Sequence, residues 1–426
     1  MNRRTFIETL GLGAVTLPGW AQAFADATAP SPAPILMPSA YFGTISPADA
    51  GFSADVTSKM STYLQSQIDA GVIPGAFVAA MRNGKVFLEE HFGVFCDRTR
   101  RDAPYDGAAI HPFHSFSKMV SATAVVMAWQ DGLIDIDTPV MKYIPEFGNG
   151  GKEPITIRML MDHSAGIPVT PKTMMTGTEE QWKAAIAGIC AESVQWPPGS
   201  RTIYHGLSGL LVSAEAVRRV SGGKTWNEIC QERIFTPLGL TSFTFDQPPA
   251  DLPLACIPRP AHPSAEWQTE IDRYAGEPAG GLKGSPTDVL KFLVFQTHRG
   301  TWKGQTLLQE KYWTEMHTPQ FPGKPIPVVK DDGTIVKPGF DCWGFGMMLR
   351  GDGPVTEGHG WFGMKDVTRP HVFGHVGTDI SMAMADPDTD TQIVFAVTDT
   401  PKSRAKAVEL RNVVTDTVFN ALSCGA

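Results

Sequence analysis

This sequence of 426 residues lacks the motifs that mark metal-binding and nucleic-acid-binding proteins. Its six cysteines are scattered, and none forms a Cys-x-x-Cys pair or a spacing typical of a zinc site. No block rich in lysine or arginine occurs and the formal net charge is −8, which argues against a nucleic-acid partner. We therefore expect a small-molecule substrate, with no metal and no cofactor, while the oligomeric state stays open.

Long apolar runs are also scarce. The run from Leu10 to Trp20 is too short and too interrupted to span a bilayer. It follows the paired Arg3 and Arg4 and precedes small-x-small sites within 21–25, an order that resembles a bacterial twin-arginine export signal. The alternative is that the arginines occur by chance. We expect residues 1–25 to be this signal, and the mature protein to be periplasmic or secreted without a membrane span.

The distribution of strand and helix patterns predicts the architecture. Residues 26–47 include a stretch rich in alanine, proline and serine and are expected to be a linker. The remainder, 48–426, is long enough for two subdomains. We predict an α+β fold in which 48–112 and 285–426 form an antiparallel sheet flanked by helices, with a mainly helical subdomain of 113–284 inserted. The expected strands are 75–81, 86–89, 344–349, 372–375, 381–385 and 393–397, and the expected flanking helices are 56–70 and 405–422.

The most informative stretch contains Ser115 and Lys118 at the start of a helical pattern that runs to Gly132. Residues three apart on a helix share a face, so the lysine amine can reach the serine hydroxyl. A serine hydroxyl becomes a nucleophile when a neighbouring base takes its proton, and N–H groups at a helix start can stabilise an oxyanion. The alternative is a capping serine followed by a solvated lysine. The apolar residues that follow indicate a buried helix and favour the catalytic interpretation.

Tyr204 lies in a Pro-Gly-containing loop that leads into another helical pattern. A tyrosine in water ionises near pH ~10, so it needs a cationic neighbour such as Lys118 to act as a base. The alternative is a packed tyrosine whose hydroxyl bonds to the backbone.

Five motifs occur in one order along the chain: Ser115-x-x-Lys118, Leu160–Ile167, Pro198-Gly199 before Tyr204, Pro278–Leu282, and His375–Gly377. Together they resemble the serine β-lactamase-like superfamily, which includes class C β-lactamases, D-alanyl-D-alanine carboxypeptidases and β-lactamase-like carboxylesterases. The Ser-x-x-Lys motif is the nucleophile motif of such enzymes. The resemblance covers nearly the whole chain from Gly75 to about Val397.

The resemblance implies a role for each matched residue. Ser115 is the acylated nucleophile, Lys118 its proton partner, and Tyr204 the base that later protonates the leaving group. His375 and Gly377 match the strand that borders the site, and the N–H groups of Thr378 and Ser115 form the oxyanion hole.

Two positions depart from the family pattern. Gly206 replaces the asparagine of Tyr-x-Asn, and His375 replaces the lysine of Lys-Thr-Gly. These changes disfavour recognition of β-lactams and peptides. We therefore predict an exported serine hydrolase, a carboxylesterase for small esters. The alternatives are a β-lactamase, a D-alanyl-D-alanine carboxypeptidase or D-amino-acid peptidase acting on an amide, and a non-catalytic penicillin-recognising sensor.

Three other histidines lie in or near these motifs. His371 and His375 have a spacing often seen in metal sites, but no third ligand is in register. His163 is expected to hold its turn through a backbone hydrogen bond, and His205 either takes part in the site or faces solvent. Trp343 belongs to a group of aromatic residues in the last third of the chain that core packing would explain.

Overall fold

The computed structural model describes residues 35–95, 103–105, 109–171, 177–248, 275–320, 326–329, 335–339, 342–351, 369–378, 381–399, 401 and 403–422, and every structural statement below concerns these ranges. The predicted signal of residues 1–25 lies outside them. None of the helices within these ranges is long and apolar enough to cross a membrane.

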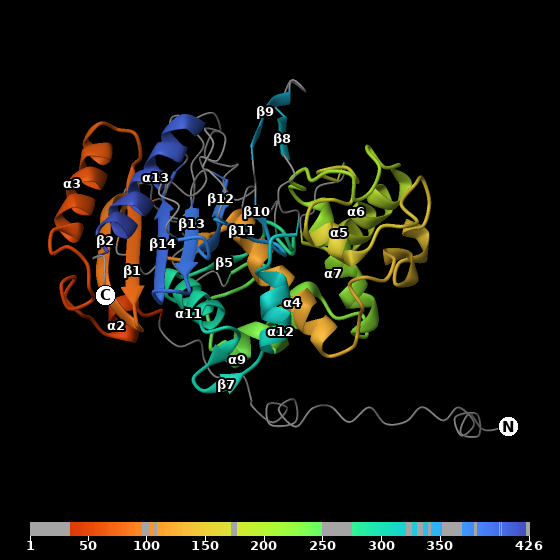
Figure 1. Ribbon diagram of the computed structural model, residues 1–426, viewed down its shortest axis with the longest axis horizontal. Helices are drawn as coiled ribbons and strands as arrows, with labels where there is room; N and C mark the ends of the chain where they lie inside the picture. The colour runs from red at the N-terminus through yellow and green to blue at the C-terminus, as the bar shows by residue number, and fades with distance from the viewer. Residues whose placement is uncertain are drawn as a thin grey trace. The chain divides into compact units, whose positions relative to one another are not determined.

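An eight-stranded antiparallel sheet joins the two ends of the chain (Figure 1). Its order is β10 (Cys342–Trp343), β11 (Met348–Leu349), β12 (Phe373–Gly377), β13 (Ser381–Asp386), β14 (Thr391–Val397), β1 (Gly75–Arg82), β2 (Lys85–Phe95) and β3 (Ala103–Pro104). β1 pairs with β14 along its length, so that Val78 lies opposite Phe395. The predicted α+β class, with strands from both ends of the chain in one antiparallel sheet, is confirmed.

The hairpin between β1 and β2 turns at Asn83 and Gly84, as predicted. Both residues have positive φ values, 48° and 73°. Asparagine and glycine adopt this conformation at low cost, and a two-residue turn of this kind matches the twist of the strands it joins.

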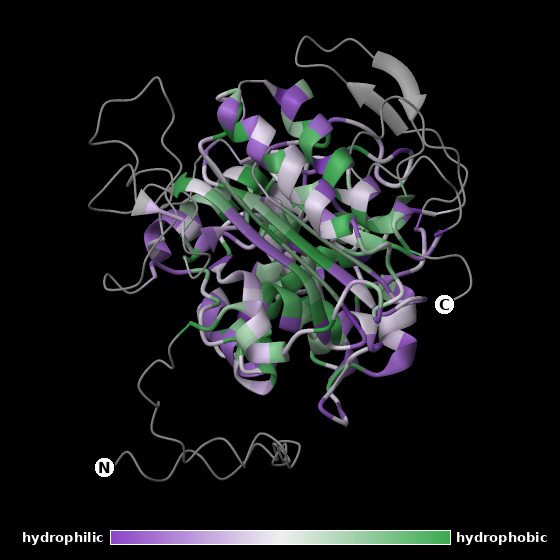
Figure 2. Cartoon of the chain, turned by 90° about the vertical axis from the view of Figure 1, so that its left-hand side faces the viewer, coloured by the Kyte–Doolittle hydropathy of each residue, from purple (hydrophilic) through white to green (hydrophobic). Residues whose placement is uncertain are grey.

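The two faces of the sheet are covered by different helices. Side chains of a strand alternate between faces, so Ala76, Val78 and Ala80 join one apolar cluster while Phe77, Ala79 and Met81 join the other. The first face is packed by α3 (Val56–Asp69) and α13 (Arg404–Asn420). The second face is packed by α11 (Pro286–Thr297) and continues into the helical part of the molecule. Figure 2 shows the hydrophobic strands between helices on both sides.

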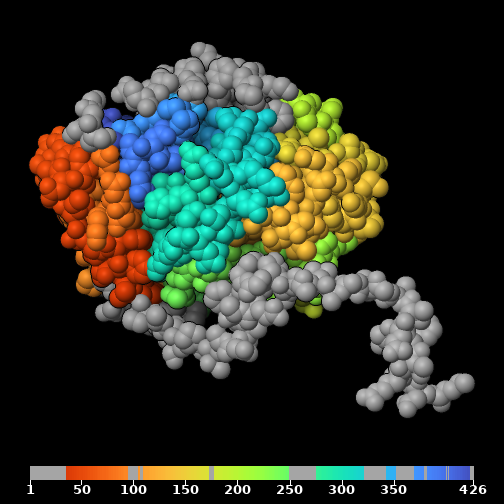
Figure 3. Space-filling model, turned by 60° about the horizontal axis from the view of Figure 1, so that its bottom comes forward, coloured from red at the N-terminus to blue at the C-terminus, as the bar shows by residue number. Residues whose placement is uncertain are grey.

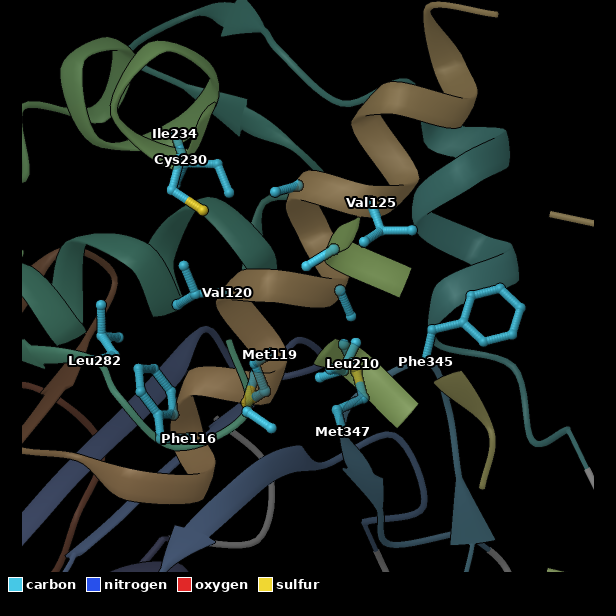
Figure 4. Close-up of a cluster of buried hydrophobic side chains, with 14 of the residues drawn as sticks. Phe116, Met119, Val120, Val125, Leu210, Cys230, Ile234, Leu282, Phe345 and Met347 are labelled. Atoms are coloured by element: carbon cyan, nitrogen blue, oxygen red, sulfur yellow. The ribbon is translucent and has the colours of Figure 1, made fainter. Parts of the chain in front are cut away.

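The helical part is built around α4 (Ser117–Gln130), whose residues from Ser117 to Ala128 are all buried. Figure 4 shows apolar side chains from several distant segments packed around it, including Leu210, Ile234 and Phe345. The surrounding elements are η1 (His114–Phe116), η2 (Val140–Lys142), η3 (Pro145–Phe147), α5 (Ile157–Met161), α6 (Glu179–Ala191), α7 (Ser208–Val220), α8 (Trp226–Cys230), η4 (Gln231–Phe235), α9 (Thr236–Leu238) and α12 (Glu310–Met316).

Three short strand pairs lie outside the main sheet: β4 (His111–Pro112) with β5 (Lys283–Gly284), β6 (Thr301–Trp302) with β7 (Gln305–Thr306), and β8 (Ile326–Val329) with β9 (Ile335–Gly339).

The surface view shows how the two parts of the molecule adjoin. The residues of α11 to α12, teal in Figure 3, lie between the β1–β2 region and the yellow surface that follows α4.

Two predicted segments differ in the structure. The expected linker of 26–47 contains a helix, α2 (Pro38–Phe42), which is held to β2 because the backbone N–H and the hydroxyl of Ser39 both donate to the Glu89 carboxylate, at 2.8 and 2.6 Å. The expected strand of 344–349 is strand only at Met348–Leu349. The bend before it follows from Gly346, whose φ is 65° and whose added Cβ would lie 2.5 Å from the Lys118 carbonyl oxygen. The other predicted subdomain boundaries stay predictions.

Candidate active site

Ser115 lies on the short 3₁₀ turn η1, which leads directly into α4. The preceding residue, His114, has a φ of 44°, an uncommon value for a side-chain-bearing residue. The hydroxyl of Ser117 donates to the His114 carbonyl and accepts from the Leu282 N–H at 2.9 Å. Ser117 is therefore engaged in holding the turn, and Ser115 is the serine of this motif that faces Lys118.

The Nζ of Lys118 lies 3.2 Å from the Oγ of Ser115 and 2.9 Å from the carbonyl oxygen of Ala279. It also lies 5.0 Å from the centroid of the Tyr204 ring, within the range of a cation–π contact. Only 1% of Lys118 is exposed. The structure therefore brings together the three residues that the sequence analysis selected as nucleophile, proton partner and base.

The segment that supplies the Ala279 carbonyl is fixed to the nucleophile helix at several points. The hydroxyl of Ser121 donates to the Pro278 carbonyl at 2.6 Å and accepts from the indole N–H of Trp226 at 3.1 Å. The N–H of Phe113 donates to the Leu282 carbonyl at 3.0 Å. These bonds position a chain segment more than 150 residues away from α4 in sequence against its N-terminal turn.

Tyr204 precedes α7 in a loop that is tied to the loop of His163. The N–H of Ile203 donates to the His163 carbonyl at 3.0 Å, and the N–H of His205 donates to His163 Nδ1 at 3.3 Å. The Tyr204 ring stacks on Trp343, with centroids 5.3 Å apart and planes 23° apart, and meets the His163 ring edge-on at 5.0 Å. Trp343 thus lines the site, a role that its sequence context did not distinguish from core packing.

His375 occupies β12 on the face of the sheet that carries Phe373 and is fully buried. Its Nδ1 lies 2.7 Å from the Val376 carbonyl, which can only accept, so Nδ1 carries the proton. Its Nε2 has no hydrogen-bond partner in the described part of the chain. Burial lowers the pKa of His375 to about 3, and the charge of Lys118 acts in the same direction. The imidazole is therefore neutral near pH 7.

Gly377 ends β12 against the turn that carries the nucleophile. A Cβ at this position would lie 2.2 Å from the Phe113 carbonyl oxygen and 2.3 Å from the Ser381 hydroxyl, so the close approach requires glycine. Thr378 follows it with a φ of 32° and is exposed. The assignment of the Thr378 N–H to an oxyanion hole stays a prediction.

Of the predictions for the other histidines, the one for His163 is confirmed and one alternative for His205 is wrong. His163 holds its turn as expected, through the backbone hydrogen bond from His205. The solvent-facing alternative for His205 is wrong, because the residue is 1% exposed and its Nε2 bonds to the Ile167 carbonyl at 3.2 Å. Burial lowers the pKa of His205 to about 4. His371 is exposed and its Nδ1 lies 2.7 Å from Asp388, whereas His375 is buried beside Tyr204.

One buried carboxyl at this site has no counterpart among the predicted residues. Glu277 is 1% exposed and begins the segment that supplies the Ala279 carbonyl. Burial raises its pKa to about 7, while the charge of Lys118 lowers it. No motif indicated Glu277, because its relation to Lys118 arises only when the two segments meet in the fold.

Comparison with known proteins places this geometry in a family. A sequence model described as Beta-lactamase matches residues 60–415, most of the chain. The chain belongs to the Beta-lactamase family. It is 30% identical over 191 residues to the protein named "Esterase/beta-lactamase LipL" of Mycobacterium tuberculosis, an alignment that covers 42% of each chain. Overall, the chain spans about 33% to 42% of the length of the curated relatives it matches.

Solved structures of the Beta-lactamase fold superpose over most of the chain. A penicillin-binding-protein homologue from Caulobacter crescentus aligns with a TM-score of 0.67 and 21% identity, covering 86% of this chain and 99% of the other. A structure described as a family VIII carboxylesterase also gives a TM-score of 0.67 at 21% identity, covering 87% and 99%. At 21% identity, this structural similarity shows that the chain has the same fold as these proteins. The resemblance to β-lactamase-like proteins that the ordered motifs indicated is confirmed.

Proposed function

We propose that this member of the Beta-lactamase family is a serine hydrolase that forms an acyl-enzyme on Ser115 and acts on small carboxylic esters. The observation that carries the proposal is the position of the buried Lys118 Nζ, 3.2 Å from the Ser115 Oγ and beside the Tyr204 ring. A nucleophile within hydrogen-bonding distance of a proton partner that is itself held in place is the arrangement that acyl transfer requires.

The reaction has two halves in this proposal. Tyr204 accepts the Ser115 proton while Ser115 Oγ forms a bond to the ester carbonyl carbon, and the resulting oxyanion is stabilised by the N–H groups of Ser115 and Thr378. The carbon–oxygen bond to the alcohol then breaks, and Tyr204 returns the proton to the leaving alkoxide. Water repeats the sequence on the acyl-enzyme, which releases the carboxylic acid and restores Ser115. Lys118 stays hydrogen-bonded to Ser115 Oγ and stabilises negative charge on the Tyr204 oxygen.

Two features favour esters over β-lactams and peptides. A carboxylate-bearing substrate calls for a cation, and the histidine at the matching strand position is buried and neutral. Arg369, an alternative cation six residues before His375 in sequence, is ion-paired with Asp386 at 2.8 Å and packs on Phe419 of α13. Gly206 offers no amide, and a Cβ there would already lie 3.3 Å from the Thr170 hydroxyl. The similar structure described as a family VIII carboxylesterase is named for ester hydrolysis, and the name of LipL includes ester hydrolysis beside β-lactam hydrolysis.

The direct test compares kcat/KM for a p-nitrophenyl ester of a short acid with that for a chromogenic cephalosporin at neutral pH. We expect the ester value to be larger by about 100-fold or more. A cephalosporin value equal to or above that of the ester would replace the proposal with a β-lactamase. Intact-mass measurement after treatment with a fluorophosphonate separates an enzyme from a non-catalytic sensor, because an enzyme gains one phosphonyl group and Ser115→Ala does not.

We also propose export by the twin-arginine route, which rests on Arg3, Arg4 and the apolar run that follows them. Substitution of both arginines by lysine should keep the precursor inside the cell, as shown by immunoblotting of periplasmic and cytoplasmic fractions. Continued appearance of the processed form outside the cytoplasm would contradict the proposal.

A further inference from the structure

Glu277 is a buried carboxyl that the reaction described above does not use. It is 1% exposed, and neither of its side-chain oxygens has a hydrogen-bond partner within the described ranges. A buried carboxylate without partners is costly, and such groups are retained at few positions other than functional ones. The position of Glu277 in the fold indicates what it could act on.

The segment that begins with Glu277 is built against the start of α4. Pro278 accepts from Ser121, Ala279 accepts from the Lys118 Nζ, and the Gly281 N–H donates back to the Glu277 carbonyl at 2.8 Å. The backbone N–H groups of Ala279 and Gly280 lie near the carboxyl without the geometry of a full hydrogen bond, and they favour its ionised form, as does the charge of Lys118. The carboxyl and the ammonium therefore share one buried region of the site.

Lys118 needs such a counter-ion. The lysine is 1% exposed, and the groups that its Nζ contacts are neutral: the Ser115 hydroxyl, the Ala279 carbonyl and the Tyr204 ring. The charge of Lys118 also acts on three histidines, which are buried with lowered pKa values and so stay neutral, and a neutral imidazole cannot offset a positive charge. A buried cation is stable only when a nearby anion offsets the loss of water.

We propose that Glu277 is the buried counter-ion of Lys118 and that its ionisation controls the proton relay on Ser115. An ionised Glu277 offsets the buried positive charge of Lys118, and that charge beside Tyr204 stabilises the negative charge on the oxygen of the proposed base. When Glu277 takes up a proton, its negative charge no longer offsets the positive charge of Lys118. Glu277 is thus a positioning residue that acts through Lys118, and the inference rests on the proposed serine hydrolase function.

The groups around this pair limit what else could titrate. Those that face Lys118 from the packed elements are His163, Tyr204 and His205 before α7, and His375 on β12. Lys283 and Asp246 adjoin the Glu277 segment at Gly281, and the charges that act on the Asp246 carboxyl are those of Lys283 and Glu228. The three histidines stay neutral far below neutral pH. The Nζ of Lys283 donates to the carbonyls of Phe245, Asp246 and Gly281. Glu277 is the group among these expected to titrate near pH 7.

The test is the pH dependence of ester hydrolysis by the full chain. For the wild type we expect kcat/KM for a p-nitrophenyl ester to fall on the acid side with a midpoint near 7, a value that belongs to the coupled groups. Glu277→Gln should remove this limb and lower the rate by about 10-fold to 100-fold at about pH 8.5, mainly through kcat. Glu277→Asp, which keeps the charge, should recover most of the rate and the limb. Asp246→Asn is the matched control, because it removes a neighbouring carboxyl that does not face Lys118, and it should leave the profile unchanged.

A folded Glu277→Gln variant with an unchanged acid limb and a rate within about threefold of wild type would overturn the inference. An infrared titration of the buried carboxyl in the wild type gives a measurement that does not depend on that variant or on activity. The midpoint should rise in Lys118→Ala, since the lysine charge lowers it, and an unchanged midpoint would also overturn the inference. If the wild type neither hydrolyses esters nor reacts with a fluorophosphonate, the proposed function fails while the infrared result still decides the pairing.

Discussion

A Cβ added to Gly377 would lie 2.2 Å from the carbonyl oxygen of Phe113. This contact joins the end of β12 to the turn that carries Ser115, and the Ser381 hydroxyl donates to the same carbonyl at 3.3 Å. The distance between the substrate-bordering strand and the nucleophile is therefore set by a backbone contact. Any side chain at position 377 must therefore displace either the end of β12 or the turn that carries Ser115.

Gly377→Ala should consequently lower kcat/KM for a short-chain ester by about 100-fold, because a displacement of about 1 Å at a reacting centre has an effect of that size. We also expect the free energy of unfolding to fall by about 1–3 kcal/mol from overpacking. The matched control is Gly188→Ala in the middle of α6, where no atom lies within 4 Å of an added Cβ. That variant should be as active as wild type and at least as stable. A fully active Gly377→Ala would show that the strand does not limit the site.

The relay of Ser115, Lys118 and Tyr204 makes a prediction about combinations of variants. Ser115→Ala, Lys118→Ala and Tyr204→Phe should each reduce kcat by about 10³-fold or more, because each removes one part of a single proton path. The double variant of Lys118 and Tyr204 should lose little more than the worse single variant. Multiplicative losses, measured with the same ester and with folding checked by circular dichroism, would indicate that the two residues act independently.

Trp343 should matter because its ring stacks on Tyr204 at 5.3 Å. Trp343→Leu removes the flat surface that fixes the tyrosine ring, and we expect kcat to fall by about 10-fold to 100-fold with a smaller effect on KM. Trp302→Leu is the control, since Trp302 is similarly buried but lies in the β6–β7 pair, which packs against α11. Equal losses of activity in the two variants would mean that the effect of Trp343 is a general loss of stability.

The parts of the site that were predictable from the sequence are those that depend on neighbours in the chain. The spacing of Ser115 and Lys118 fixes their contact within one turn, and Asn83-Gly84 fixes the hairpin through its own backbone. The parts that were missed depend on contacts between residues that are far apart in the sequence. Ala279 reaches Lys118 across 161 residues of sequence, and Glu277 arrives with it. No local pattern reports such a contact.

The errors have the same origin. A solvent-facing His205 was one of two alternatives from the sequence, but the residue is buried and its ring bonds to the Ile167 carbonyl. The segment of Gly344 to Leu349 alternates like a strand. Its glycines instead let the backbone approach α4, where Gly346 lies against the Lys118 carbonyl.

The last prediction concerns stability against pH. Five histidines are buried with pKa values lowered mainly by burial: about 3 for His111, His317 and His375, about 4 for His205, and well below the usual value for His163. In the unfolded chain these histidines bind protons near pH 6.5, so the unfolded state gains protons first as the pH falls. Each buried histidine therefore lowers the free energy of unfolding by about 1.4 kcal/mol for every pH unit below that value. Glu277 and Asp162, with pKa values raised to about 7 and 6, act in the opposite direction as the pH rises above about 4.5, and so do Asp246 and His298, whose pKa values are also raised. These are four groups against five, and His298 is exposed enough for solvent to weaken its effect. We therefore expect Tm to fall by several degrees between about pH 7 and about pH 5, measured by calorimetry in Ser115→Ala to exclude turnover. His317→Asn, which removes one buried imidazole without touching the site, should make the decrease smaller, and a Tm that stays constant or rises toward pH 5 would contradict the neutral burial of these histidines.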